Sequence, residues 1–290
     1  RQMTTVQADN VHALAIEGTF DDCQDMVKAM FADAEFRGEV GLSAVNSINW
    51  ARIMAQIVYY FWATLRLGAP DREIDFCVPT GNFGNVFAGY AAKQMGLPVG
   101  QLMVGSNRND ILTRFFENDD MSIQGVEPSL SPSMDIQISS NFERYLFDLL
   151  DRSGSATART MVDFRATGRM NVGQGGWEQA KRDFHAFALS DPKCLDAIRR
   201  WREKTGEVLD PHTVIGVEHA AQFGRPGVPA VALATAHPAK FPAAIEQALD
   251  QTPALPAHLG DLYERSESFT SLPNQLKEVQ QYVRAHRRQS

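Results

Sequence analysis

Short apolar runs alternate along the chain with segments in which apolar residues recur every three or four positions. Residues 11–16 form such a run, and the segment that follows, up to residue 36, shows the spacing of one buried helix face. A longer helix is predicted over residues 48–67 by the same criterion. The positions expected on its inward face are Ile53, Ile57, Tyr60, Phe61 and Leu65.

The next part of the chain repeats a unit of strand, turn and helix. A strand over residues 74–78 is followed by a helix over 86–95, and a strand over 98–104 by a helix over 110–117. This alternation favours parallel strands, because each helix carries the chain back across the sheet. The predicted fold class is therefore α/β, with an open, mainly parallel sheet and helices on both faces.

The pattern changes in the second half of the chain. Residues 119–226 consist of polar loops between predicted helices such as 142–150 and 191–205, which indicates a mainly helical insertion. The run VPAVALA at residues 228–234 is continuously apolar, as is typical of a central parallel strand that is buried on both faces. A helix over residues 241–249 follows it.

The composition of the chain argues against several classes of function. Lys and Arg total 28 against 35 for Asp and Glu, and the formal net charge of -7 argues against a nucleic-acid partner, which needs a basic face. No apolar run approaches the roughly 18 residues of a membrane span. Isolated cysteines, at 23, 77 and 194, suit a reducing cytoplasm, and neither they nor the histidines have the spacing of metal ligands. The chain opens on Arg1 and a polar segment, so we expect no secretion leader and a natural N-terminus further upstream.

The most informative segment is the turn after the strand at 74–78. Gly81, Asn82, Gly84 and Asn85 lie between a buried strand and a helix, where backbone amides and the positive helix end can hold an anion. The spacing matches neither GxxxxGK[ST] nor GxGxxG, which favours a small monophosphate. A glycine-containing turn without a ligand is the alternative; two uncharged amide side chains in one turn favour the phosphate.

The segment VPTGNFGN at residues 78–85 resembles the phosphate-binding loop of fold-type II pyridoxal-phosphate (PLP) enzymes, and of threonine synthases in particular. Four other blocks are similar to the fungal and proteobacterial branch of that family, in the same order. They are IEGTFDDCQDMVK (16–28), NSINWARIMAQIVYYF (46–61), PSMDIQISSNFER (132–144) and TAHPAKFP (235–242). The resemblance covers close to the whole chain and implies the tryptophan synthase beta-like fold.

The resemblance also implies a domain organisation. Residues 1–65 would be the remainder of a smaller mobile domain with a linking helix. Residues 66–118 and 227–290 would form the cofactor-binding α/β domain, and residues 119–226 the helical insertion. The portion that holds the Schiff-base lysine would be missing at the N-terminal side.

Carried over residue by residue, the resemblance implies two groups of cofactor-binding residues. Those implied for the phosphate of PLP are Gly81, Asn82, Phe83, Gly84 and Asn85. Thr235 is implied for the pyridine nitrogen, where a neutral hydroxyl moderates the electron sink of the ring. The alternative for Thr235 is a strand-end threonine that bonds to the backbone. The neighbouring His237 and Lys240 are expected to be structural or solvent-facing.

A second anion site is expected at the start of the helix at 48–67. Ser47 and Arg52 match the positions that bind the substrate's phosphate in related enzymes, and Asn49 is a further candidate. An ordinary helix cap, with the arginine on a solvated face, explains the same residues equally well.

The lysine that such an enzyme needs does not occur here in an FKD context, and the Ser/Thr-Gly-Asp-Thr-Gly loop is also missing. The resemblance therefore implies that the chain is a fragment of a threonine synthase. The whole enzyme would convert O-phosphohomoserine and water to threonine and phosphate. This chain would contain no catalytic residue and would have little activity when isolated. Two alternatives remain: a threonine-synthase-like phospholyase that releases a keto acid, and a non-catalytic phosphate- or cofactor-binding relative. The sequence does not distinguish a monomer from a homodimer.

Overall fold

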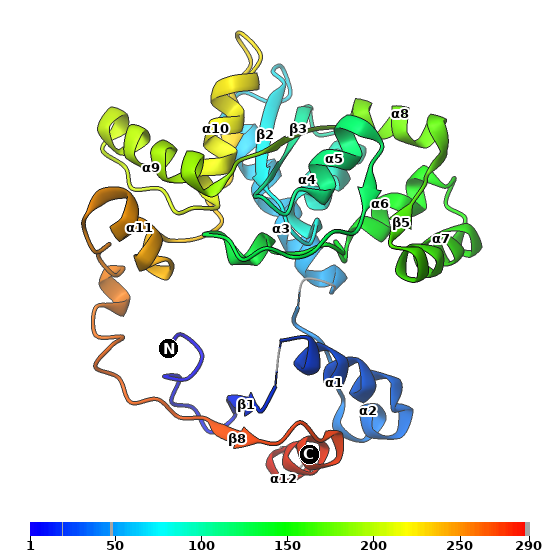
Figure 1. Cartoon of the computed structure of the whole chain (residues 1–290), viewed down its shortest axis with the longest axis vertical. Helices are drawn as coiled ribbons and strands as arrows, with labels where there is room; N and C mark the ends of the chain where they lie inside the picture. The colour runs from blue at the N-terminus through cyan, green and yellow to red at the C-terminus, as the bar shows by residue number, and fades with distance from the viewer. Residues whose placement is uncertain (19, 47–48, 288–290) are drawn as a thin grey trace. The chain divides into compact units, whose positions relative to one another are not determined.

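A computed structural model describes residues 1–18, 20–46 and 49–287 (Figure 1). Contacts divide the chain into a larger unit, residues 45–254, and a smaller unit of residues 1–44 with 255–290. The smaller unit contains β1 (Leu14–Ile16), α1 (Phe20–Ala32), α2 (Ala34–Val40), the short η3 (Ala257–Leu259), β8 (Thr270–Leu272) and α12 (Leu276–His286). None of the helices in the described ranges is both long and apolar enough to cross a bilayer.

The larger unit carries the sheet and the helices around it. Its strands are β2 (Ile74–Pro79), β3 (Val99–Ser106), β4 (Met121–Ser122), β5 (Arg169–Met170), β6 (Phe184–Ala188) and β7 (Ala230–Ala232). Its helices are α3 (Trp50–Arg66), α4 (Gly84–Gln94), α5 (Ile111–Asn118), η1 (Pro132–Met134), α6 (Phe142–Leu149), α7 (Gly154–Thr167), α8 (Gly173–Asp183), α9 (Asp191–Thr205), α10 (Thr213–Phe223), η2 (Pro238–Lys240) and α11 (Pro242–Leu249).

A four-stranded parallel sheet in the order β6-β3-β2-β7 organises this unit. Every residue of β2 is buried. Phe76 and Val78 of β2 share one apolar cluster with Ile53 and Tyr60 of α3, while α10 packs against β2, β3 and β7. Both faces of β2 are therefore covered, and the predicted α/β class with a mainly parallel sheet is confirmed.

Glycines bring the helices unusually close to the sheet. A Cβ placed on Gly89 of α4 would lie 2.7 Å from the ring of Tyr60 and 2.8 Å from Leu102 of β3. On the other face, a Cβ on Gly105 of β3 would lie 2.9 Å from Ile215 of α10. A side chain at either position would collide, so the backbone of α4 at Gly89 and of β3 at Gly105 lies directly against side chains of the neighbouring elements.

A buried carboxylate joins the central strands. Asp75 of β2 is fully buried and accepts hydrogen bonds from Arg225 at 2.6 and 3.0 Å. The same carboxylate accepts from the backbone nitrogen of Gln101 in β3 at 2.7 Å. The ion pair thus connects β2 to β3 and to the segment that leads into β7.

Three features differ from the sequence-based expectations. Within the stretch expected to be a helical insertion, β6 forms a strand of the sheet, and α10 packs against the strands β2, β3 and β7. Of the run VPAVALA only Ala230–Ala232 form a strand, β7, which lies at the edge of the sheet with a neighbour on one side only among the described residues. Leu65, expected on the inward face of α3, is 60% exposed, whereas Ile53 and Tyr60 are fully buried.

The domain boundaries also differ from those expected. Contacts place residues 255–290 with the N-terminal 44 residues, and place residues 45–65 with the sheet. In the smaller unit β1 pairs in parallel with β8, and one apolar cluster has Met26, Met30, Phe36 and Val279 as its buried members. That pairing of two distant segments explains the difference, because the chain's end returns to its beginning.

Replacing Arg225 by methionine should destabilise the larger unit, because it leaves the charge of Asp75 buried without its partner. We expect the free energy of unfolding to fall by about 3–5 kcal/mol in urea titrations. Arg159→Met, at an exposed position of α7, is the matched control and should change it by less than about 0.5 kcal/mol. Equal effects of the two substitutions would contradict the role given to the Asp75 pair.

Candidate functional site

The turn between β2 and α4 is strained and held by aromatic packing. Phe83 precedes α4 with a φ of 62°, a left-handed conformation that costs a non-glycine residue about 1–3 kcal/mol. Its side chain is only 1% exposed. The rings around it are those of Phe116, Phe142, Tyr145 and Phe184. Burial of the ring offsets the strain, so the turn is fixed with the first-turn amides of α4 at its end, where anions bind.

A second segment, residues 133–141, is fastened to this turn. The hydroxyl of Ser139 donates to the carbonyl of Gly81 at 2.7 Å, and the side chain of Asn141 donates to the carbonyl of Asn82 at 2.9 Å. A Cβ on Gly81 would lie 2.7 Å from the carbonyl oxygen of Ser133. Only glycine therefore permits this approach of two backbones.

The carboxylate of Asp135 sets the conformation of that segment. It accepts from the side chains of Asn107 at 2.7 Å, Asn109 at 2.9 Å and Ser129 at 2.6 Å, and from the backbone nitrogen of Ser129 at 2.9 Å. Asn107 and Asn109 are buried and follow the end of β3. The network therefore fixes the segment that contains Ser133, next to the turn, relative to the end of β3.

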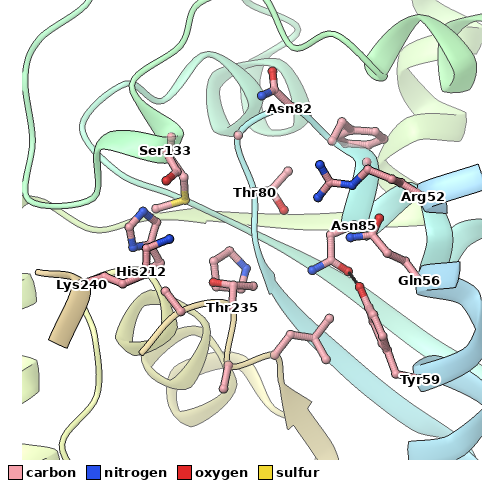
Figure 2. A pocket seen from close by; sticks show the side chains of 18 of the residues that line it. Arg52, Gln56, Tyr59, Thr80, Asn82, Asn85, Ser133, His212, Thr235 and Lys240 are labelled. Carbon is pink, nitrogen blue, oxygen red and sulfur yellow. Dashed lines mark hydrogen bonds between the residues drawn. The ribbon is translucent and has the colours of Figure 1, made fainter. Parts of the chain in front are cut away.

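The side chain of Asn85 is oriented by two tyrosines of α3. Its carbonyl oxygen accepts from the hydroxyls of Tyr59 and Tyr60, which directs the amide nitrogen toward the cavity (Figure 2). Burial raises the pKa of Tyr59 to about 12, so this hydroxyl remains a donor at neutral pH. Asn85 can therefore donate a hydrogen bond to a group in the cavity.

A cavity of about 610 Å³ lies at the carboxyl ends of β2 and β7. This volume falls in the range of small-molecule sites, and the carboxyl edge of a parallel sheet is where such sites form. Its polar side chains come from α3, the turn, the fastened segment, the residue before α10 and the chain after β7. They are Arg52, Gln56, Tyr59, Thr80, Asn82, Asn85, Ser133, His212, Thr235 and Lys240 (Figure 2).

The cavity brings together most of the residues expected from the sequence. The five residues 81–85, Arg52 and Thr235 all line it. Asn49 does not line it and instead caps α3, with its side-chain oxygen accepting from the backbone nitrogen of Ala51 at 2.9 Å. Ser47 falls outside the described residues. His237 caps η2 by accepting from the backbone nitrogen of Ala239, in agreement with a structural role.

Three lining residues carry chemistry that the sequence did not reveal. Lys240 is exposed, as expected, and also lines the cavity, and so does Gln56, one turn after Arg52. His212 is 4% exposed, with its Nδ1 3.0 Å from Asp210. No motif marks these positions; only the helical offset of Gln56 from Arg52 could have indicated one of them.

Asp135→Ala should release the segment that borders Gly81. Because Asn107, Asn109 and Ser129 would lose an acceptor inside the protein, we expect the free energy of unfolding to fall by about 2–3 kcal/mol. Amide hydrogen exchange at residues 129–135 should also become faster. Asp163→Ala, at an exposed position of α7, is the control, and equally slow exchange in the two variants would contradict the role of Asp135.

Comparison with known proteins identifies a related group. Residues 213–283 match the family model of the threonine synthase C-terminal domain. The chain is 56% identical to threonine synthase of Pseudomonas aeruginosa over 99% of its own length and 61% of that protein, and 40% identical to that of Schizosaccharomyces pombe over 94% and 60%. It therefore spans about three fifths of these relatives.

A solved structure shows the same relationship. PLP-bound threonine synthase from Brucella melitensis matches with a TM-score of 0.93 and 51% sequence identity, over 99% of this chain and 62% of that one. The resemblance inferred from the five sequence blocks is thereby confirmed. The chain is thus similar to threonine synthases over nearly its whole length, and its residues 213–283 match the model of their C-terminal domain.

Proposed function

We propose that this chain forms the PLP-binding part of a threonine synthase, and that it anchors both the cofactor and the phosphate of O-phosphohomoserine. The observation that carries the proposal is the meeting of the residue 81–85 turn, Arg52 and Thr235 in one cavity. When bound, PLP would supply an electron sink for carbanion chemistry on the substrate. The remaining steps concern what the residues of this chain would do around it.

The cavity fits a phosphorylated aromatic cofactor. Gly81 has no room for a side chain, and the turn ends at the amino terminus of α4, so its amides would bind the cofactor phosphate. Asn85 offers an oriented amide nitrogen beside them. Thr235 follows the end of β7 and would place its hydroxyl at the pyridine nitrogen.

Arg52 would bind the second phosphate. It lies on the side of α3 that faces the cavity, with Gln56 one turn further along. A guanidinium can hold a phosphate ester through two parallel hydrogen bonds and would stabilise the charge as phosphate leaves. Asn49 is a weaker candidate because its oxygen already caps α3. We retain Ser47 as a proposed ligand on sequence alone.

The base that moves protons is proposed to lie in a part of the longer protein outside this chain. Lys240 is the only lysine among the described residues that line the cavity, and it lacks the FKD context. A phospholyase that releases a keto acid would use the same anchors, and analysis of the product distinguishes it. A non-catalytic relative is distinguished by the coding DNA upstream of Arg1, where an in-frame FKD lysine supports the enzyme.

The isolated 290-residue chain should release no phosphate from O-phosphohomoserine above background when PLP is supplied. The physical reason is the absence of a lysine in the expected context. Phosphate release measured with a coupled colorimetric assay checks this. Turnover that disappears in Lys240→Met would show instead that the base is in this chain.

In the longer enzyme, Arg52→Ala and Thr235→Val should separate two effects. Removing the guanidinium should raise KM for O-phosphohomoserine by about 10- to 100-fold, since charged hydrogen bonds contribute about 1.5–3 kcal/mol. Removing the Thr235 hydroxyl should mainly lower kcat and shift the absorption spectrum of bound PLP. Steady-state kinetics with both variants checks this, and an unchanged KM in Arg52→Ala would remove the phosphate assignment.

A further inference from the structure

The side chain of His212 has one buried nitrogen without a partner beside the cavity. His212 lines the cavity, yet only 4% of it is exposed. Its Nδ1 lies 3.0 Å from the carboxylate of Asp210, whereas its Nε2 is buried and has no hydrogen-bond partner among the described residues. Buried polar atoms are nearly always paired in folded proteins, so an unpaired one needs an explanation. Because Asp210 does not line the cavity, Nε2 is the nitrogen that is left for a ligand there.

The imidazole of His212 is fixed on two sides. The ring of Phe241 lies 4.7 Å from it, between ring centres. On the other side Asp210 is 1% exposed, and its carboxylate accepts from the backbone nitrogens of His212 at 2.9 Å and Thr213 at 3.3 Å, and from the hydroxyl of Thr213. All these groups are donors and favour the ionised carboxylate, which in turn keeps the proton of a neutral imidazole on Nδ1. The lone pair of the neutral imidazole is therefore on Nε2.

The carboxylate of Asp210 lacks a permanent cation as partner. Within the described ranges its ion-pair partner is His212, and no lysine or arginine reaches it. A buried carboxylate is stabilised by an opposite charge in direct contact with it. A second proton on the imidazole would supply that charge and would convert the hydrogen bond at Nδ1 into an ion pair.

The charges around the cavity decide when that proton can bind. Arg52 and Lys240 line the cavity, and among the described residues no aspartate or glutamate does so. In Figure 2 His212 and Lys240 lie on one side of the cavity and Arg52 on the other. Two cations so close favour a neutral imidazole while no anion is bound. An anion that enters offsets their charge, and the imidazole can then take up a proton.

The other ionisable groups near His212 keep their charge around neutral pH. Burial raises the pKa of Cys194, whose thiol contacts the carbonyl of Pro211, to about 12. Burial also raises the pKa of Tyr59, which lines the cavity, to about 12. Arginine and lysine side chains stay protonated in the same range. Histidine is the only side-chain type at this wall that ordinarily changes its charge between about pH 5 and 8.

We propose that Asp210 and His212 couple the binding of an anion in the cavity to the uptake of one proton. When a phosphate group enters, Nε2 takes a proton from water and donates it in a charge-assisted hydrogen bond to the anion. Bonds between heavy atoms are unchanged, and Asp210 balances the new positive charge. The coupling rests on the proposed function, because it takes a phosphate-bearing ligand as the guest of the cavity. Since linkage is reciprocal, the anion binds more tightly as the pH falls.

Sulfate is the probe, because this tetrahedral dianion carries no proton near neutral pH and any proton taken up must bind to the protein. Titration calorimetry with the 290-residue chain measures its affinity. We expect the affinity to fall about tenfold between about pH 6 and about pH 8. His212→Gln cannot take up the proton, and should bind sulfate at both pH values as weakly as the unsubstituted chain does at the higher one. His258→Gln, at an exposed position of η3, is the matched control and should keep the tenfold change.

Nitrogen NMR of the histidine side chains gives a second measurement that needs no variant. One of the seven histidines should carry its proton on Nδ1 alone without sulfate, and on both nitrogens when sulfate is bound at neutral pH. If no histidine gains a proton on sulfate binding, the coupling is overturned.

Arg52→Ala separates the coupling from the proposed function. It should weaken sulfate binding at both pH values, because Arg52 lines the same cavity. Sulfate that binds in this Arg52-dependent manner, but with equal affinity at both pH values, would overturn the coupling and leave the proposed anion site in place. Absence of sulfate binding at either pH would overturn both together.

Discussion

The site depends on one strained residue. Phe83 is held in a left-handed conformation because its ring is buried among four other aromatic rings, which come from α5, α6 and β6. If the ring were exposed, the backbone could relax and the amides at the start of α4 would turn away from the cavity. The aromatic cluster therefore determines the geometry of a site that it does not itself line, apart from Phe83.

The sequence predicted the parts of the site that local chemistry controls. The residue 81–85 turn could be located because glycine and asparagine residues between a buried strand and a helix are typical of an anion-binding turn. Arg52 and Thr235 followed from the resemblance to a family, and spacing alone left each of them with a structural alternative. Asn49 could not be assigned from the sequence, because asparagine is common both as a helix cap and as a phosphate ligand; in the structure it caps α3.

Other features could not be predicted because they depend on distant partners. The strand β6 has too few residues and too mixed a pattern to be separated from its helical surroundings, and only its pairing with β3 defines it. Leu65 satisfies the helical period of a buried face, yet it is 60% exposed in the structure.

Many of the contacts that shape the cavity join residues far apart in the chain. Ser139 reaches Gly81 across 58 positions, and at the other end of β2 Arg225 reaches Asp75 across 150. Closing loops of that length is unfavourable until the sheet exists, so the contacts of the site depend on the sheet. The unfolded chain has no such site for an anion. An anion that binds the cavity therefore stabilises the folded state by mass action, and the effect grows with the ratio of its concentration to its dissociation constant.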